Sequence, residues 1–309
     1  MRMNETGNVY DVVFHENSTF LNSLIKLKTC IKKEFIYGGH VLALGSSLVA
    51  VSVMILNGMI LKWEFLPIIY LITLCIYNFD HYREMEKDFS DNLGRVNHLF
   101  KYKKILPILI TTYGISSITL LIMFGNLESI IFGIVFLSMG IVYSYKVKKL
   151  TSKILAFKNF YTASAVALSA LFTVIYCGFQ INWLFFVIFV FLFLRFFVNT
   201  SFCDIKDMQT DKKHGILTLP LFFGKNYFLK LLHIINLLSF VVLISAIILE
   251  ILPAYSIFLV FVNIYCFYYI KKSKCPKINI TSLSDIIVDG EFIFWPIFLI
   301  IGKSVFMIL

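Results

Sequence analysis

Residues 184–220 read LFFVIFVFLFLRFFVNTSFCDIKDMQTDKKHGILTLP, an apolar run that continues directly into an acidic segment. The run from Leu184 to Cys203 is as long as the roughly 20 apolar residues that a helix needs to cross a bilayer. Asp204, Asp207 and Asp211 follow at spacings of three and four. On a continuing helix these spacings place three carboxylates on one face. This stretch therefore predicts a membrane-spanning helix with an acidic face at its end.

The composition of the whole chain agrees with a membrane protein. Of 309 residues, 59% are hydrophobic and 15% are charged, with a mean hydropathy of +0.84. Soluble domains average about 45–50% apolar and about 25% charged residues. These values exclude a soluble globule and a disordered chain, and they predict an all-α polytopic membrane protein. The apolar runs along the chain predict nine transmembrane helices. The nine expected spans are 38–61, 65–82, 104–124, 127–145, 159–178, 181–203, 228–249, 252–270 and 286–308.

The basic residues indicate how the chain is oriented. With nine spans, 25 of the 28 Lys and Arg residues fall on the amino-terminal side, and only Lys62 falls on the opposite side. Such an excess marks the cytoplasmic side of a membrane protein, so the net charge of +10 requires no nucleic-acid partner. We expect a cytoplasmic tail over 1–36, a transmembrane domain over 37–309, and a location in the cell membrane. The links after 65–82 and 181–203 are long and lie on the same side, which places the expected active-site face in the cytoplasm.

A second acidic stripe ends the expected span 65–82. Asp80, Glu84 and Asp88 are spaced i, i+4 and i+8, so they share one helix face and repel each other. Carboxylate oxygens suit Mg²⁺, which usually shares its coordination shell with substrate phosphates. Two such stripes predict Mg²⁺ held against a phosphorylated ligand, although ordinary solvated acids that balance nearby lysines remain an alternative. The expected metal ligands are Asp80, Glu84, Asp88, Asp204, Asp207 and Asp211.

The segment from Arg195 to Pro220 resembles the second aspartate-rich motif of the UbiA-type intramembrane prenyltransferases. That motif reads DxxDxxxD, followed by a basic residue, a glycine and T-L-P. The matching positions are Asp204, Asp207, Asp211, Lys212, Gly215, Thr218, Leu219 and Pro220. The first motif of the family, NDxxDxxxD, is altered here, because Ile76 and Tyr77 occupy the positions of its Asn and first Asp.

The resemblance implies nine transmembrane helices in a bundle around a central cavity, with both motifs on the cytoplasmic side. It also implies Mg²⁺-dependent transfer of an isoprenyl group from an isoprenyl diphosphate to a hydrophobic acceptor, either aromatic or a membrane lipid. By this resemblance Asp80, Asp207 and Lys158 are expected to be catalytic. The side chains expected to bind the diphosphate are Arg95, Lys158, Lys212 and Arg195.

Two alternatives remain open from the sequence. Arg195 lies within an apolar run, so it could instead pair with a charge on a neighbouring helix. The whole chain could be a non-enzymatic cation- or lipid-binding protein or a transporter. A transporter is expected to carry charges near the bilayer midplane and broken central helices, whereas the acids of this chain gather at one face.

Overall fold

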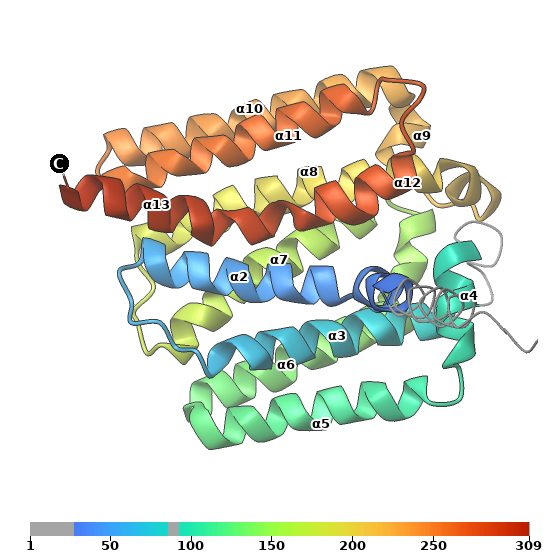
Figure 1. Ribbon diagram of the computed structural model, residues 1–309, viewed down its shortest axis with the longest axis horizontal. Coiled ribbons are helices and arrows are strands. Elements are labelled where there is room, and N and C mark those ends of the chain that lie inside the picture. Colours follow the sequence, from blue (N-terminus) through green and yellow to red (C-terminus); the bar gives the residue numbers. More distant parts are fainter. Residues whose placement is uncertain (1–27, 86–92, 309) are drawn as a thin grey trace, which may run out of the picture.

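The computed structural model describes residues 28–85 and 93–308, and this part of the chain is helical, without strands. The long helices lie side by side and alternate in direction (Figure 1). The helices of the first half are α2 (His40–Leu56), α3 (Phe65–Glu84), α4 (Leu93–Lys101), α5 (Leu106–Phe124), α6 (Leu127–Tyr145), η2 (Val147–Ser152) and α7 (Phe157–Tyr176). The second half contains α8 (Trp183–Lys213), α9 (Leu219–Phe223), α10 (Lys225–Ile248), η3 (Ala254–Leu259), α11 (Val260–Lys272), α12 (Ile280–Ser282), η4 (Leu283–Val288), η5 (Asp289–Ile293) and α13 (Phe294–Ile308).

A long helical segment occupies each of the nine expected spans, so the all-α membrane fold is confirmed. Within the described residues, seven helices are long and apolar enough to cross a membrane, or eight if one bent pair is counted as a span. The bent pair consists of Lys28–Tyr37 and α2, at 60° to each other. The other exception is α3, which has 20 residues but is polar toward its end, where Asn78, Asp80 and His81 lie. The number nine therefore remains a prediction.

The bend before α2 depends on a glycine. Gly39 has a φ of 84°, and a Cβ at this position would lie 2.3 Å from the ring of Tyr77 on α3. Both the positive φ and the close contact exclude a larger side chain. The bend therefore brings the start of α2 against the part of α3 that precedes its acidic residues.

Helices α7 and α8 form the close-packed centre of the bundle. Ala163, Ala167 and Ala170 on α7 are fully buried, and α7 packs against both α2 and α8. Small side chains permit this approach, because association of helices in lipid depends on close packing rather than on the hydrophobic effect. On α8, the ring of Phe196 stacks on Phe292 of η5, which joins the centre to the last helical segment.

The acidic part of α8 is a direct continuation of its apolar part. Asn182 caps the first turn by accepting a hydrogen bond from the backbone N–H of Phe185, at 3.1 Å, and the helix then runs without interruption for 31 residues. It ends at His214, followed by Gly215 with a φ of 65°. The carboxylates of α8 are thus held on a rigid helix at the end of the bundle where α4 and α9 also lie (Figure 1).

Candidate active site

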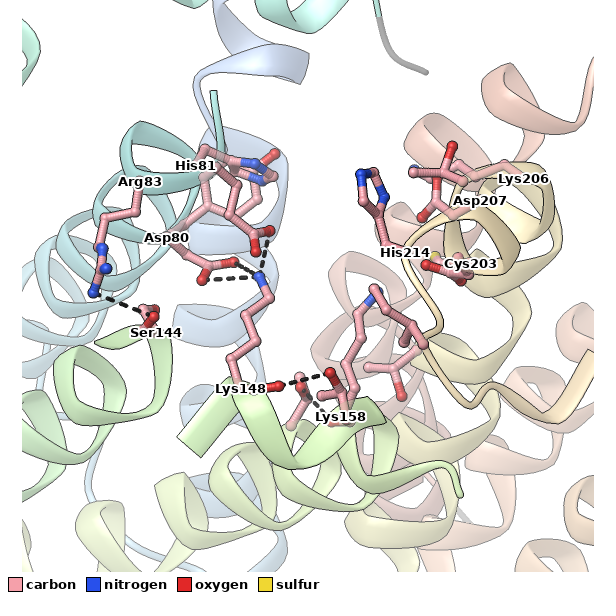
Figure 2. Close-up of a pocket in the computed structure, with 18 of the residues that line it drawn as sticks. Asp80, His81, Arg83, Ser144, Lys148, Lys158, Cys203, Lys206, Asp207 and His214 are labelled. Atoms are coloured by element: carbon pink, nitrogen blue, oxygen red, sulfur yellow. Dashed lines mark hydrogen bonds and ion pairs between the residues drawn. The ribbon is translucent and has the colours of Figure 1, made fainter. Parts of the chain in front are cut away.

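One cavity joins the ends of the two helices that carry the acidic segments. It has a volume of about 580 Å³ and is lined by Asp80 and Glu84 of α3 and by Asp207 and Asp211 of α8. Figure 2 shows Asp80 and Asp207 on opposite sides of this space. The prediction that the two acidic segments converge is therefore consistent with the fold, although they are far apart in the sequence. Asp88 lies outside the described residues.

Lys148 forms ion pairs with the two described acids at the end of α3. The Nζ atom of Lys148, in η2, lies 3.1 and 2.8 Å from the two carboxylate oxygens of Asp80 and 2.5 Å from Oε2 of Glu84. All three side chains are partly exposed to the cavity. Sequence reasoning missed Lys148, because it is one of several lysines in the link after α6 and no spacing distinguishes it.

The acids of α8 divide into two groups. Asp204 is fully buried and does not line the cavity. Its Oδ2 atom accepts a hydrogen bond from Asn159 at 2.9 Å, and its Oδ1 atom lies 3.3 Å from Nζ of Lys158. Asp204 therefore connects α8 to the first turn of α7 and presents Lys158, which does line the cavity.

Asp207 is the acid of α8 that is best placed to bind a ligand. It lines the cavity, it is partly exposed, and within the described residues no ion pair or hydrogen bond occupies its carboxylate. Asp211 lies one helical turn further on and lines the same cavity. Carboxylate oxygens at this spacing are a suitable donor set for Mg²⁺, with water and phosphate oxygens completing the shell. In the part of the chain that is described, no preformed cluster of three or more His, Cys, Asp or Glu side chains suits a metal.

Arg95 lies over the cavity from the short helix α4. Its Nη1 atom is 3.2 Å from Nε2 of His81, and its Nη2 atom is 3.8 Å from Oδ1 of Asp285. Burial lowers the pKa of the Arg95 guanidinium, but Tyr77 and the carboxylates nearby outweigh this effect and hold its pKa above the usual value. Arg95 is thus a permanent cation at the cavity, and its binding of a diphosphate stays a prediction.

Asp285 is a further charged residue that sequence reasoning missed. It lies in η4 and binds Nζ of Lys206 at 2.5 Å. One turn later, Asp289 begins η5 and lines the cavity. The spacing of these two acids repeats that of the acids on α3, which is the signal that could have identified them.

The structure does not bring Arg195 or Lys212 to the cavity. Arg195 is fully buried in α8, where its guanidinium binds Glu291 and the side-chain oxygen of Asn236. Tyr269 donates a hydrogen bond to the second oxygen of Glu291, at 3.1 Å. The structure thus shows the alternative that the sequence left open, a charge paired with a neighbouring helical segment. Lys212 lies in the last turn of α8, outside the residues that line the cavity.

An apolar chamber adjoins the charged cavity. It has a volume of about 230 Å³ and lies among α2, α3, α6, α7 and α8. The two spaces share seven wall residues, namely Leu42, Tyr77, Asp80, Ser144, Thr162, Asn199 and Thr200. The rings of Tyr143 and Tyr161 stack at 4.2 Å between centroids and both line the chamber. A ligand with a charged head and a short apolar tail matches this arrangement.

Fold and site together define an all-helical membrane protein with two acidic helix ends and several cations around one cavity. The sequence profile described as the UbiA prenyltransferase family matches residues 95–277, more than half of the chain. The protein belongs to this family. A search of curated protein sequences finds no significant match.

Solved structures of UbiA homologues share the fold. A homologue from Archaeoglobus fulgidus bound to GPP and Mg²⁺ is 16% identical, with a TM-score of 0.65 over 88% of this chain and 99% of its own. A homologue from Aeropyrum pernix K1, in its apo form, is 9% identical, with a TM-score of 0.67 over 87% of this chain and 98% of its own. A structure concerned with digeranylgeranylglyceryl phosphate synthase is 17% identical, with a TM-score of 0.54 over 89% and 98% of the two chains. At these identities the likeness shows the fold alone.

Proposed function

We propose that this protein transfers an isoprenyl group from an isoprenyl diphosphate to an aromatic or lipid acceptor within the membrane, with Mg²⁺ as cofactor. One observation carries the proposal: the acidic ends of α3 and α8 line a single cavity that adjoins an apolar chamber. The A. fulgidus homologue bound to GPP and Mg²⁺ supports the same class of donor and metal.

The charges of the cavity suit a diphosphate. Asp207 and Asp211 would hold Mg²⁺, which supplies Lewis-acid stabilisation of the departing diphosphate. Lys158 and Arg95 supply fixed positive charge on two sides of the cavity. Cations that are already oriented stabilise developing negative charge without reorganisation, which lowers the barrier to breaking the C–O bond.

The chamber suits the isoprenyl chain. Bound there, the chain places its first carbon near the shared wall, close to Asp80 and Thr162. When the C–O bond breaks, the electron pair leaves with the diphosphate oxygen and an allylic cation remains. Tyr143 and Tyr161 line this region, and aromatic rings stabilise cations that lie over an uncovered face. An acceptor carbon or oxygen then forms the new bond and loses a proton, which the released diphosphate or water accepts.

We further propose that the cavity faces the cytoplasm of a cell membrane. The basic links η2 and α4 lie at the cavity end of the bundle, and lysine and arginine gather on the cytoplasmic side of membrane proteins. Labelling of single cysteines introduced into these links in intact cells, compared with permeabilised cells, tests this orientation.

The decisive experiment combines purified protein with labelled dimethylallyl or geranyl diphosphate, Mg²⁺ and a panel of aromatic and lipid acceptors. We expect a prenylated product with the wild-type protein and loss of that product in Asp207→Asn. Glu128→Gln is the matched control, because Glu128 is an exposed acid in the first turn of α6, at the other end of the bundle. Full activity of Asp207→Asn would overturn the site. A non-enzymatic protein would give no product and no Mg²⁺-dependent thermal protection by a non-hydrolysable diphosphate analogue.

A further inference from the structure

Lys148 occupies the space between the acids of α3 where a divalent cation would be expected. Its ammonium contacts both oxygens of Asp80 and one oxygen of Glu84. An ammonium group has three N–H donors, and these contacts direct it toward two carboxylates at once. In this position a protein cation provides the neutralisation that a metal would otherwise provide.

The backbone that carries Lys148 is held by hydrogen bonds to the residues that follow it. Thr151 donates its hydroxyl hydrogen to the carbonyl oxygen of Lys148, at 2.6 Å. The backbone N–H of Leu217 donates to the carbonyl oxygen of Thr151 at 2.9 Å, and the carbonyl oxygen of Leu217 accepts from the N–H of Ala156 at 3.0 Å. The segment that contains Lys148 is therefore tied to the chain just after α8, which limits how far this cation can move from the acids.

The facing ends of α3 and α6 are also fixed. The guanidinium of Arg83 lies 4.1 Å above the ring of Tyr145, and its Nη1 atom donates to the carbonyl oxygen of Ser144 at 3.5 Å. These contacts set the distance between the acids of α3 and the start of η2. The position of Lys148 thus follows from the packing of three elements rather than from one flexible side chain.

A single monovalent cation neutralises part of the charge of the described acidic segment. Ile76 and Tyr77 stand where the family motif has its Asn and first Asp, and Ile76 faces Gly140 of α6, in the wall of the apolar chamber. The described part of the segment therefore offers two carboxylates, and one ammonium leaves a net charge of minus one. On α8, by contrast, no described cation is bonded to Asp207.

From these contacts we infer that Lys148 is a tethered cation that replaces a divalent metal at α3, so that the protein binds one divalent ion, at Asp207 and Asp211. This inference rests on the proposed function only for the identity of the anionic ligand. The number of metal ions can be measured without any turnover.

The test counts Mn²⁺ bound to the full-length protein in detergent, by electron paramagnetic resonance and isothermal titration calorimetry. We expect one Mn²⁺ per wild-type chain, both alone and with a non-hydrolysable isoprenyl diphosphate analogue. Lys148→Met should bind two, because its loss frees the carboxylates of Asp80 and Glu84. Lys146→Met is the matched control, since Lys146 is an exposed lysine of the same link outside the cavity lining, and it should bind one.

Two further variants keep the test decisive. Lys148→Gln removes the charge but retains a hydrogen-bond donor, so it should also gain a second Mn²⁺ if Lys148→Met fails to fold. Asp207→Asn should lose the single ion of the wild type. Two ions in the wild type, with or without the analogue, overturn the inference, as does a folded Lys148→Met or Lys148→Gln that binds only one.

The outcome is separate from that of the proposed function. An inactive protein that binds one Mn²⁺ and gains a second in Lys148→Met supports the tethered cation and contradicts the prenyl transfer. A protein that makes product and binds two ions supports the transfer and contradicts the tethered cation.

Discussion

The side-chain amide of Asn159 donates a hydrogen bond of 2.9 Å to Oδ2 of Asp204 inside the interface of α7 and α8. This contact separates Asp204 from the other acids of its helix, because the same carboxylate also pairs with Lys158 and is closed off from the cavity. Asp204 is therefore a residue that positions Lys158, whereas Asp207 is partly exposed in the cavity and Asp211 lines the same cavity.

We predict that Asp204→Ala and Asp207→Ala have different effects on the free energy of unfolding. Asp204→Ala leaves a buried amide and an ammonium without their acceptor, which should lower the free energy of unfolding by about 1–3 kcal/mol. Asp207→Ala removes a carboxylate that is not bonded to any described residue, so its stability should stay within about 0.5 kcal/mol of wild type. Denaturant unfolding in detergent measures both values. Equal destabilisation by the two substitutions would contradict the assignment of Asp204 as a buried, paired residue and of Asp207 as a carboxylate without a structural partner among the described residues.

A second prediction concerns the buried pair of Arg195 and Glu291. Arg195→Met leaves the carboxylate of Glu291 buried without its cation, and breaking such a pair costs about 3–5 kcal/mol. Arg195→Met combined with Glu291→Leu should recover part of this loss, since both charges are then absent. The folded fraction of the double variant should keep wild-type affinity for an isoprenyl diphosphate analogue in calorimetry. A large loss of affinity there would instead favour a direct role of Arg195 in binding the diphosphate.

A third prediction concerns Arg95. Removing its charge in Arg95→Met should weaken binding of an isoprenyl diphosphate analogue about tenfold, equivalent to about 1.4 kcal/mol. Lys101→Met is the matched control, because Lys101 is an exposed cation of the same short helix. This variant should bind the analogue with wild-type affinity.

The contribution of Arg95 should also be independent of pH. Its pKa is held above the usual value by the surrounding negative groups, so the guanidinium stays protonated throughout the range of about pH 6–9. Analogue affinities of wild type and Arg95→Met, measured by calorimetry across this range, should keep a constant ratio. A ratio that falls with rising pH would show that a group other than Arg95 supplies the positive charge.

A fourth prediction addresses the length of the isoprenyl chain. Ala165 of α7 lines the apolar chamber of about 230 Å³. Phenylalanine at this position fills space that a longer chain needs, so Ala165→Phe should reduce affinity for geranyl diphosphate more than for dimethylallyl diphosphate. Competition binding of the two donors to one preparation measures the ratio, which makes the shorter donor the internal control. An unchanged ratio would show that the chain lies elsewhere.

Much of the fold was predictable because lipid imposes strict requirements on a chain. The nine apolar runs each became a long helical segment, and the run from Leu184 continues through the acidic residues as one helix. The sequence did not show where α3 stops being apolar enough to cross the membrane, or that the chain bends before α2. Polar residues enter the last turns of α3, and Gly39 bends the chain before α2.

The sequence predicted most of the acids at the site, but it did not predict which side chains pair with them. On a helix, Asp204, Asp207 and Asp211 span roughly 60° of one face, and spacing alone does not reveal that α7 covers the first of them. The contact of Lys148 with Asp80 joins elements far apart in the sequence, and it depends on how α3 packs against α6. Pairings of this kind arise from tertiary structure, so a pattern within one segment cannot display them.

Under the proposed function, the wall that the cavity shares with the apolar chamber would give the two products separate routes out of the protein. A released pyrophosphate is multiply charged and soluble, so it leaves by the charged mouth into water. The prenylated product has lost that anchor and has gained hydrocarbon, so its free energy falls as it moves sideways into lipid. Because Tyr77 and Asp80 line both spaces, the residues of this wall would then divide the proposed products between two solvents.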